Sequence, residues 1–473
     1  MNATDKLSET EKLMAQADLR KLVLRYSVPT IIGMLVNALY NVVDRFWVGR
    51  LPGETGLYGL TGIGLCMSQM VLALGFSQLS GVGAASRISI ALGVGDRKRA
   101  EQILGNALTL CLITATASTI LQYVFATQIL MLIGADEHTL PYATDYLNIV
   151  LAGCFVQITG LALNHCIRST GNPKRFASTQ VLGAVVNAVL DPVLIYGFHM
   201  GIKGAAYATV ASQILSAAWV ISYYFHDNST LHFRLPNLRL KPEIVRQIVS
   251  IGSAAFFTQV MGSVTWVFAN RTLKRYGDLE YLGGGTIAIT AATVIQSVNT
   301  LVTMPVIGIN QGMQPIIGFN FGMKNYERAK KAFWWAMIYA TVVCVAGFVL
   351  IQTRAPSLIH IFNDDDGLVA MGVSGLKIML CTISLAGVYL LAPVFFQAIG
   401  RAKLSIVLIM LRQAALIIPL LIVMPTFFGL NGVWMAQPIS DVTITIVSVI
   451  LLKREFRIFK KINAEKAGDN QTA

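Results

Sequence analysis

Long apolar runs recur along the whole chain and constrain its fold more than any other feature. They begin near Val23 and continue to Leu452, and about 18–20 apolar residues are enough for a helix to cross the hydrocarbon core of a bilayer. The chain is 55% hydrophobic and only 13% charged, whereas soluble domains contain about 25% charged residues. We therefore predict an all-α membrane protein with twelve transmembrane helices in two pseudo-symmetric six-helix bundles. The expected spans are 23–49, 57–85, 102–126, 140–165, 176–197, 204–225, 246–272, 285–316, 332–353, 368–398, 404–427 and 431–452.

The net charge of +13 is concentrated in the loops and termini. If the N-terminus is cytoplasmic, most of the 37 Lys and Arg fall on the inner side, while the acidic stretches Asp136–Glu137 and Asp364–Asp366 fall outside. Cytoplasmic loops of membrane proteins carry such an excess of Lys and Arg. We therefore expect a multi-pass protein of the cell (inner or plasma) membrane with both termini cytoplasmic, lying in the lipid bilayer and with no nucleic-acid partner.

The chain divides into two similar halves around its most polar internal stretch, His226–Arg246. Three ordered matches relate the halves at an offset of about 224–229 residues, and repeats with an even number of spans insert in the same orientation. In membrane proteins built from such parallel repeats, a substrate site is expected between the two halves. The matches are 81–100 with 308–329, 171–174 with 400–403, and 200–205 with 428–433. The expected organisation is a cytoplasmic N-terminal segment (1–22), an N-lobe (23–226), a cytoplasmic linker (227–245), a C-lobe (246–452) and a cytoplasmic C-terminal tail (453–473).

Signatures of enzymes are missing from the sequence. There is no G-x-S-x-G, H-E-x-x-H or P-loop motif, and the six His are scattered without metal-ligand spacing. The six Cys lie in or beside apolar spans and form no C-x-x-C pair, so they are typical of small apolar residues. We expect neither an enzyme nor a cofactor, and no metal beyond a coupling Na⁺. We also expect no removed signal peptide, because no short apolar stretch precedes the first span.

Polar stripes run along four spans of the N-terminal half, and two stripes contain a carboxylate, Asp44 or Asp191. Residues spaced by three, four or seven share one face of a helix. A charge at the centre of a span costs roughly 2.5–3.5 kcal/mol, so such faces must point to the bundle interior or to water. The other polar residues of the stripes are Asn37, Asn41, Gln157, Asn164, Gln180, Asn187, Thr209, Gln213 and Ser216.

Two interpretations of these stripes remain open. Hydrogen bonding between packed helices explains the Asn, Gln, Thr and Ser side chains well. It explains Asp44 and Asp191 poorly, because neither has a Lys or Arg in its own central stripe. Two neighbouring carboxylates in a low dielectric cannot both ionise cheaply, so one takes a proton or a cation binds between them. This second interpretation predicts a site that responds to H⁺ or Na⁺.

The C-terminal half carries a different set of charges, Lys377, Arg412 and Asp441. Arg412 and Asp441 lie on adjacent late spans and are plausible partners, either as a buried structural pair or as part of a polar site. Lys377 either lines a central cleft or extends its ammonium group towards the outer surface. Several spans also contain proline, which removes a backbone hydrogen bond and bends a helix.

Two segments resemble the multidrug and toxic compound extrusion (MATE) family. Residues 37–49, NALYNVVDRFWVG, resemble its first span in the prokaryotic branch that has an Asp there, and residues 187–197, NAVLDPVLIYG, resemble its fifth span. The resemblance covers nearly the whole chain, from about Leu19 to Leu452. It implies coupling-ion positions at Asp44, Asn187, Asp191 and Thr209, cavity-lining positions at Tyr146 and Asn164, and a helix-bending proline at Pro29.

The resemblance implies a secondary active antiporter. Such a protein exports small organic compounds, cationic or amphipathic, in exchange for inward H⁺ or Na⁺ by alternating access, and works as a monomer. The alternative is a flippase for a lipid-linked precursor, which shares the two-lobed plan but is expected to carry several Arg or Lys in its central cleft. The sequence does not decide between H⁺ and Na⁺.

Overall fold

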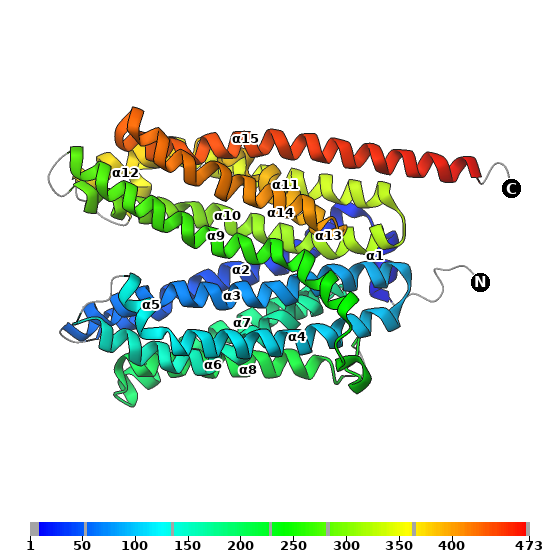
Figure 1. The fold of residues 1–473 in the computed structure, drawn as a ribbon, viewed down its shortest axis with the longest axis horizontal. Coiled ribbons are helices and arrows are strands. Elements are labelled where there is room, and N and C mark those ends of the chain that lie inside the picture. The colour runs from blue at the N-terminus through cyan, green and yellow to red at the C-terminus, as the bar shows by residue number, and fades with distance from the viewer. Residues whose placement is uncertain are drawn as a thin grey trace. The chain divides into compact units, whose positions relative to one another are not determined.

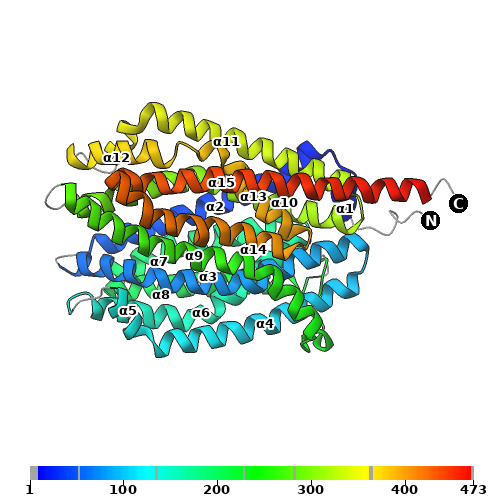
Figure 2. The same cartoon turned by 45° about the horizontal axis from the view of Figure 1, so that its top comes forward.

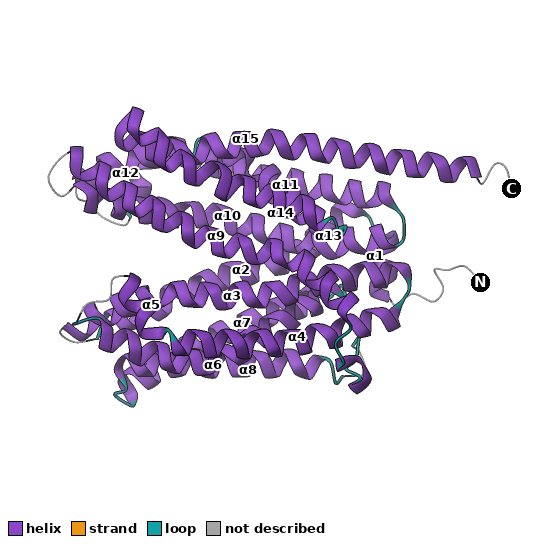
Figure 3. Cartoon of the chain, in the orientation of Figure 1, coloured by secondary structure: helices purple, strands orange, loops and turns teal. Residues whose placement is uncertain are grey.

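The computed structural model describes residues 9–51, 54–133, 137–226, 229–280, 284–361 and 366–469. Every regular element in these ranges is a helix, as Figure 3 shows, which confirms the predicted all-α class. The first half contains α1 (Glu9–Gln16), α2 (Leu19–Gly49), α3 (Glu54–Val94), α4 (Arg97–Val124), α5 (Ala126–Ile133), α6 (Leu140–Ser169), α7 (Pro173–Pro192), η2 (Val193–Gly197), α8 (Gly201–Tyr223) and η3 (Leu235–Leu238). The second half contains α9 (Pro242–Glu280), α10 (Gly284–Gly322), α11 (Tyr326–His360), α12 (Asp366–Met379), η4 (Ile383–Leu385), α13 (Ala386–Ala398), α14 (Ala402–Met410), η5 (Leu411–Ile417) and α15 (Ile418–Asp469).

Eleven helical segments among the described residues are long and apolar enough to cross a membrane. The last segment, Ala402–Glu465, contains Gly429, whose φ of +58° interrupts the helix. A side chain at such a φ would be strained, whereas glycine adopts it readily. Gly429 therefore separates two spans, and the described helices agree with the predicted twelve.

The internal repeat is visible in the backbone as pairs of left-handed residues. Each pair marks the same turn between helices in the two halves, and its members lie 228 or 229 residues apart. The two helices that follow the first turn also begin alike, because Asp96 and Asn325 each accept a hydrogen bond from the backbone N–H three residues on. The pairs are Gly95 with Lys324, Gly171 with Gly400, and Gly201 with Gly429.

The chain forms two compact units whose boundaries cut through α2 and α9 instead of falling in the polar linker. The first unit contains residues 28–259 together with 1–16, and the second contains 17–27 and 260–473. The expected division into 23–226 and 246–452 therefore differs from the observed one at both helices. The start of α2 belongs with the second unit, and the start of α9 belongs with the first.

Close helix crossings at glycines account for this division. Within the first unit, a Cβ on Gly252 of α9 would overlap the Leu79 carbonyl of α3, and a Cβ on Gly83 would overlap the Ile248 carbonyl. Within the second unit, Gly312 of α10 packs in the same way against Ser27 of α2. Small residues let helix backbones approach closely in membranes. The first turns of α9 and α2 are thereby held by α3 and α10.

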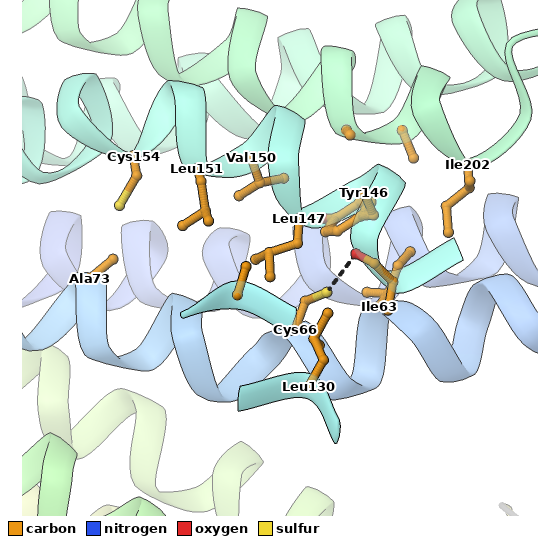
Figure 4. Close-up of a cluster of buried hydrophobic side chains, with 14 of the residues drawn as sticks. Ile63, Cys66, Ala73, Leu130, Tyr146, Leu147, Val150, Leu151, Cys154 and Ile202 are labelled. Atoms are coloured by element: carbon orange, nitrogen blue, oxygen red, sulfur yellow. Dashed lines mark hydrogen bonds between the residues drawn. The ribbon is translucent and has the colours of Figure 1, made fainter. Parts of the chain in front are cut away.

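In the first unit, α6 is the central helix. It packs against α3, α4, α7 and α8, and the views in Figures 1 and 2 both show it running alongside α3, α4 and α8. One buried apolar cluster joins α3, α4, α6 and α8, with Ile63, Cys66, Leu147 and Leu151 among its members (Figure 4). The Cys66 thiol in this cluster donates to the Ala143 carbonyl at 3.4 Å (Figure 4), so it is a packed interior thiol.

The described part of the predicted linker is fastened to α4. The Asn106 side chain donates to the carbonyls of Asn237 and Arg239 and accepts from the Lys241 N–H at 2.7 Å. Arg234 forms an ion pair with the buried Glu101 at 2.7 Å. The polar linker is thus an ordered strap on the first unit.

Candidate functional site

Residue spacing from one helix contact puts the two predicted carboxylates at the same level of α2 and α7. Gly33 of α2 packs against Ala177 and Gln180 of α7. Asp44 lies eleven residues beyond Gly33, and Asp191 lies eleven residues beyond Gln180. Because both helices rise by about 1.5 Å per residue, equal steps from one contact keep the two side chains level. Asp44 is close enough to act electrostatically on Asp191.

These residues form a buried polar group inside the first unit. Asp191, Asn187 and Thr209 are each 0% exposed, and Asp44 is 6% exposed. The Asn187 amide nitrogen donates to Asp191 Oδ1 at 3.2 Å. Asp191 Oδ2 and Asn187 Oδ1 are buried, and neither has a hydrogen-bond partner in the described part of the chain. Buried polar atoms are usually paired, and an exception calls for an explanation such as an ion or a proton.

An aromatic contact joins the helix ends just beyond the carboxylates. The Tyr196 hydroxyl donates to the Trp47 carbonyl at 2.8 Å, and the two rings meet edge to face at 6.0 Å. Trp47 follows Asp44 by three residues, and Tyr196 follows Asp191 by five. The contact therefore holds α2 and the short π-helix η2 together next to the carboxylate group.

A polar cavity lies along the same helix faces, in the first unit. Its volume is about 120 Å³, which is below the roughly 300–1,000 Å³ of typical small-molecule sites, and it is open in part to the outside. Four of the predicted cavity-lining residues, Asn37, Gln157, Asn164 and Gln180, are on its walls. The other lining residues are Val156, Gly160, Leu161, Thr179, Gly183, Ala184, Ser212, Gln213, Ser216 and Ala217.

The cavity and the carboxylate group are neighbours on α7 and α8. On α7 the cavity wall ends at Ala184, and Asn187 follows within one helical turn. On α8, Ser212 of the cavity donates to the carbonyl of Thr209, which belongs to the buried polar group. A charge change at the carboxylates is thus about one helical turn from this polar cavity.

The donor set suits a small cation or protons. Carboxylate, amide and hydroxyl oxygens are hard ligands of the kind that hard metal ions prefer. No group of three or more His, Cys, Asp or Glu that could hold a metal is present among the described residues. A bound cation would therefore rest on two carboxylates supplemented by neutral oxygens.

Three further predicted residues lie elsewhere or outside the description. Tyr146 is 1% exposed within the apolar cluster (Figure 4) and is not among the residues lining the cavity. The side chain of Asn41 lies outside the described residues. Pro29 is inside α2, two residues after the point where that helix passes from one unit to the other.

The charged residues of the second unit form an ion pair and an exposed cation. Arg412 Nη2 lies 2.9 Å from Asp441 Oδ1, and Asp441 is 1% exposed. The Lys377 side chain is exposed on α12, and its carbonyl accepts a hydrogen bond from the Gln352 side chain. The structure thus brings Arg412 and Asp441 together, and Lys377 is not among the residues that line the cavity of the first unit.

Sequence reasoning noted Gly183 between Gln180 and Asn187 but did not predict that glycines line the cavity where α8 packs closely against α6 and α7. Gly160 and Gly183 line it, and a Cβ on either would meet α8 at Ala217 or Ser216. A glycine within an apolar span carries no chemical signal of its own. The signal that was available is position, because Gly183 lies between Gln180 and Asn187 on the same face of α7.

Two repeated helical units that span a membrane, with buried carboxylates beside a polar cavity, are features of membrane transporters. Comparison with known families agrees. The family model MatE matches residues 29–193 and 279–423, which together exceed half of the chain. The protein therefore belongs to the MatE family.

Curated relatives and solved structures extend this match over nearly the full length. The multidrug export protein MepA of Staphylococcus saprophyticus is 27% identical over 91% of this chain and 93% of its own. MepA of Staphylococcus haemolyticus is 24% identical over 96% of both chains. A MATE crystal structure in a bent conformation has a TM-score of 0.89 at 25% identity, covering 97% of this chain and 100% of that one. These relatives are transporters, and they favour multidrug export over the flippase alternative.

Proposed function

We propose that this protein is a multidrug exporter of the cell membrane that exchanges small organic compounds, cationic or amphipathic, for inward H⁺ or Na⁺. Substrate binds in the polar cavity of the first unit, and the coupling ion binds at Asp44 and Asp191, with Asn187 and Thr209 supplying neutral oxygens. A single chain carries the whole exchange, and both termini face the cytoplasm.

One observation carries the proposal. Asp191 is fully buried, shares only one of its two oxygens with Asn187, and has the Asp44 carboxylate within electrostatic range. A carboxylate in this position is costly unless a proton or a cation neutralises it. The cavity with its polar walls begins within a helical turn of Asn187.

Exchange follows if the two ligands favour different conformations. An unneutralised carboxylate pair attracts a cationic substrate in the neighbouring cavity, and H⁺ or Na⁺ binding removes that attraction. A ligand shifts a conformational equilibrium only by its difference in affinity between the two states. Coupling therefore requires that the ion and the substrate each bind one of the two conformations better.

The test is ethidium uptake into proteoliposomes, with an H⁺ gradient or a Na⁺ gradient imposed separately. We expect one of the gradients to drive uptake by the wild-type protein and to fail with Asp191→Asn. The amide is nearly isosteric with the carboxyl group, so a side chain needed only for packing would tolerate the change. The gradient that works identifies the coupling ion.

Asp145→Asn is the matched control. It makes the same chemical change at an exposed carboxylate of α6, which pairs with Lys203 at 3.2 Å. This variant should transport like the wild type. Normal gradient-driven uptake by Asp191→Asn, with wild-type elution from size exclusion, would sink the proposal.

A further inference from the structure

Three residues of the second unit occupy repeat positions whose counterparts in the first unit line the cavity. Gly160 and Gly183 line the cavity, eleven residues before and twelve residues after Gly171. The paired left-handed glycine of the second half is Gly400, and the same steps from it lead to Tyr389 and Arg412.

The third position follows from the next pair of turns. Gln213 of the cavity lies twelve residues after Gly201, and Asp441 lies twelve residues after its counterpart Gly429. Two glycines and a glutamine of the first unit are thus replaced in the second by a tyrosine, an arginine and an aspartate.

These three replacements contact one another in the second unit. Arg412 Nε and Nη2 each lie 2.9 Å from Asp441 Oδ1. The Arg412 guanidinium carbon lies 4.5 Å from the centre of the Tyr389 ring. Tyr389 and Asp441 are 5% and 1% exposed. The charges neutralise each other, and large side chains stand at positions whose counterparts line the cavity of the first unit.

We propose that Tyr389, Arg412 and Asp441 fill the second unit's counterpart of the substrate cavity, so that each chain has one substrate site, in the first unit. The assignment of a substrate site rests on the proposed function, whereas the filling concerns only side chains of the second unit. The ion pair thereby sets the number of binding sites in a protein built from two copies of one plan.

Two serines at equivalent positions offer a matched pair of reporters. Ser212 lines the cavity of the first unit. Ser212 lies eleven residues beyond Gly201, and its counterpart Ser440 lies eleven residues beyond Gly429. Ser440 is 0% exposed and donates to the Arg412 carbonyl at 3.1 Å. Ser→Cys is nearly isosteric, so each variant tests access without opening new space.

The experiment measures modification by a small cationic methanethiosulfonate reagent, followed as the mass shift of the intact purified protein. Cys381→Ser serves as background, because Cys381 is exposed and the other five cysteines are buried. Ser212 is 4% exposed but borders the cavity, whereas Ser440 is packed against Arg412, so we expect Ser212→Cys to react at least roughly tenfold faster than Ser440→Cys. Equal rates would overturn the proposal.

A second pair of variants separates filling from charge. Arg412→Ala with Asp441→Ala removes both side chains and should raise the rate at Ser440→Cys by roughly tenfold, because the residue becomes exposed. Arg412→Met with Asp441→Leu keeps most of the bulk and should leave it protected, and such apolar replacements of buried ion pairs are often tolerated. Continued protection of Ser440→Cys in a folded double-alanine variant would refute the filling.

The two proposals fail separately. Absence of gradient-driven ethidium uptake by the wild-type protein would contradict the proposed function without altering these labelling rates. Reaction of Ser440→Cys with the native ion pair in place would contradict the filling without affecting transport.

Discussion

At the scale of single residues, the central question is whether Asp44 and Asp191 act as one group. They come from helices that are far apart in the sequence, yet they lie level and interact electrostatically. Asn187 holds one oxygen of Asp191 and leaves the other available. An arrangement of this kind titrates, or binds a cation, as a pair.

We expect Asp44→Asn, Asp191→Asn and the double variant to lose similar amounts of gradient-driven uptake, because each change removes the same shared site. Independent sites more than about 7–10 Å apart would instead give additive losses in free energy. The measurement is the initial rate of ethidium uptake in proteoliposomes. Asp44→Asn combined with Asp145→Asn is the control and should match Asp44→Asn alone; a double Asp44 and Asp191 variant far below both singles would argue against a shared site.

Much of this site could be predicted from residue spacing. Helical periodicity put Asn37 on the stripe of Asp44, and Gln180 and Asn187 on the stripe of Asp191, and the structure places Asn37 and Gln180 on one cavity wall. The distance between the stripes could not be predicted, because it depends on which residue of α2 meets which residue of α7. The sequence also could not predict where Tyr146 lies, because an aromatic ring with a hydroxyl suits a cavity wall and an apolar core equally well.

At the scale of helices, glycine decides where the compact units begin and end. Gly252 brings α9 so near to α3 that even a methyl group would meet the Leu79 backbone. Gly262 lies on the same helix, and nothing within 4 Å would meet its Cβ. The sequence shows two glycines in one apolar span and does not distinguish them, because the difference lies in the neighbouring helix.

Gly252→Ala and Gly262→Ala form a matched pair. We expect Gly252→Ala to destabilise the fold by roughly 1–3 kcal/mol through overpacking against backbone atoms. Gly262→Ala should be neutral or slightly stabilising, because alanine is favoured over glycine within a helix by about 1 kcal/mol or less. Thermal unfolding of the purified proteins in detergent is the measurement. Equal melting temperatures for the two variants would show that the crossing with α3 tolerates a methyl group.

At the scale of the whole molecule, the sequence repeat predicted the architecture well and the division of the chain less well. The turn pairs at Gly171 with Gly400 and Gly201 with Gly429 reproduce two of the three sequence matches residue by residue. The polar linker marked the middle of the chain, but it is fastened to α4, and the boundary between the units falls inside α9. Polarity reports where a chain meets water, whereas compactness depends on which helices cross closely.

The repeat also makes a prediction about orientation. Each half has six spans, so equivalent turns of the two halves face the same side of the membrane. Lys98, beside the first turn, and Lys324, at its counterpart, are both exposed, and the excess of basic residues near them predicts the cytoplasmic side. Lys203 follows an odd number of further spans and should face outwards.

We therefore expect an impermeant maleimide applied to intact cells to label Lys203→Cys and to spare Lys98→Cys and Lys324→Cys, each placed in the Cys381→Ser background. After lysis all three should react, because all three side chains are exposed. Labelling of Lys98→Cys from outside would reverse the orientation of the first half. Labelling of only one of Lys98→Cys and Lys324→Cys would contradict the parallel repeat itself, because the two turns would then face opposite sides.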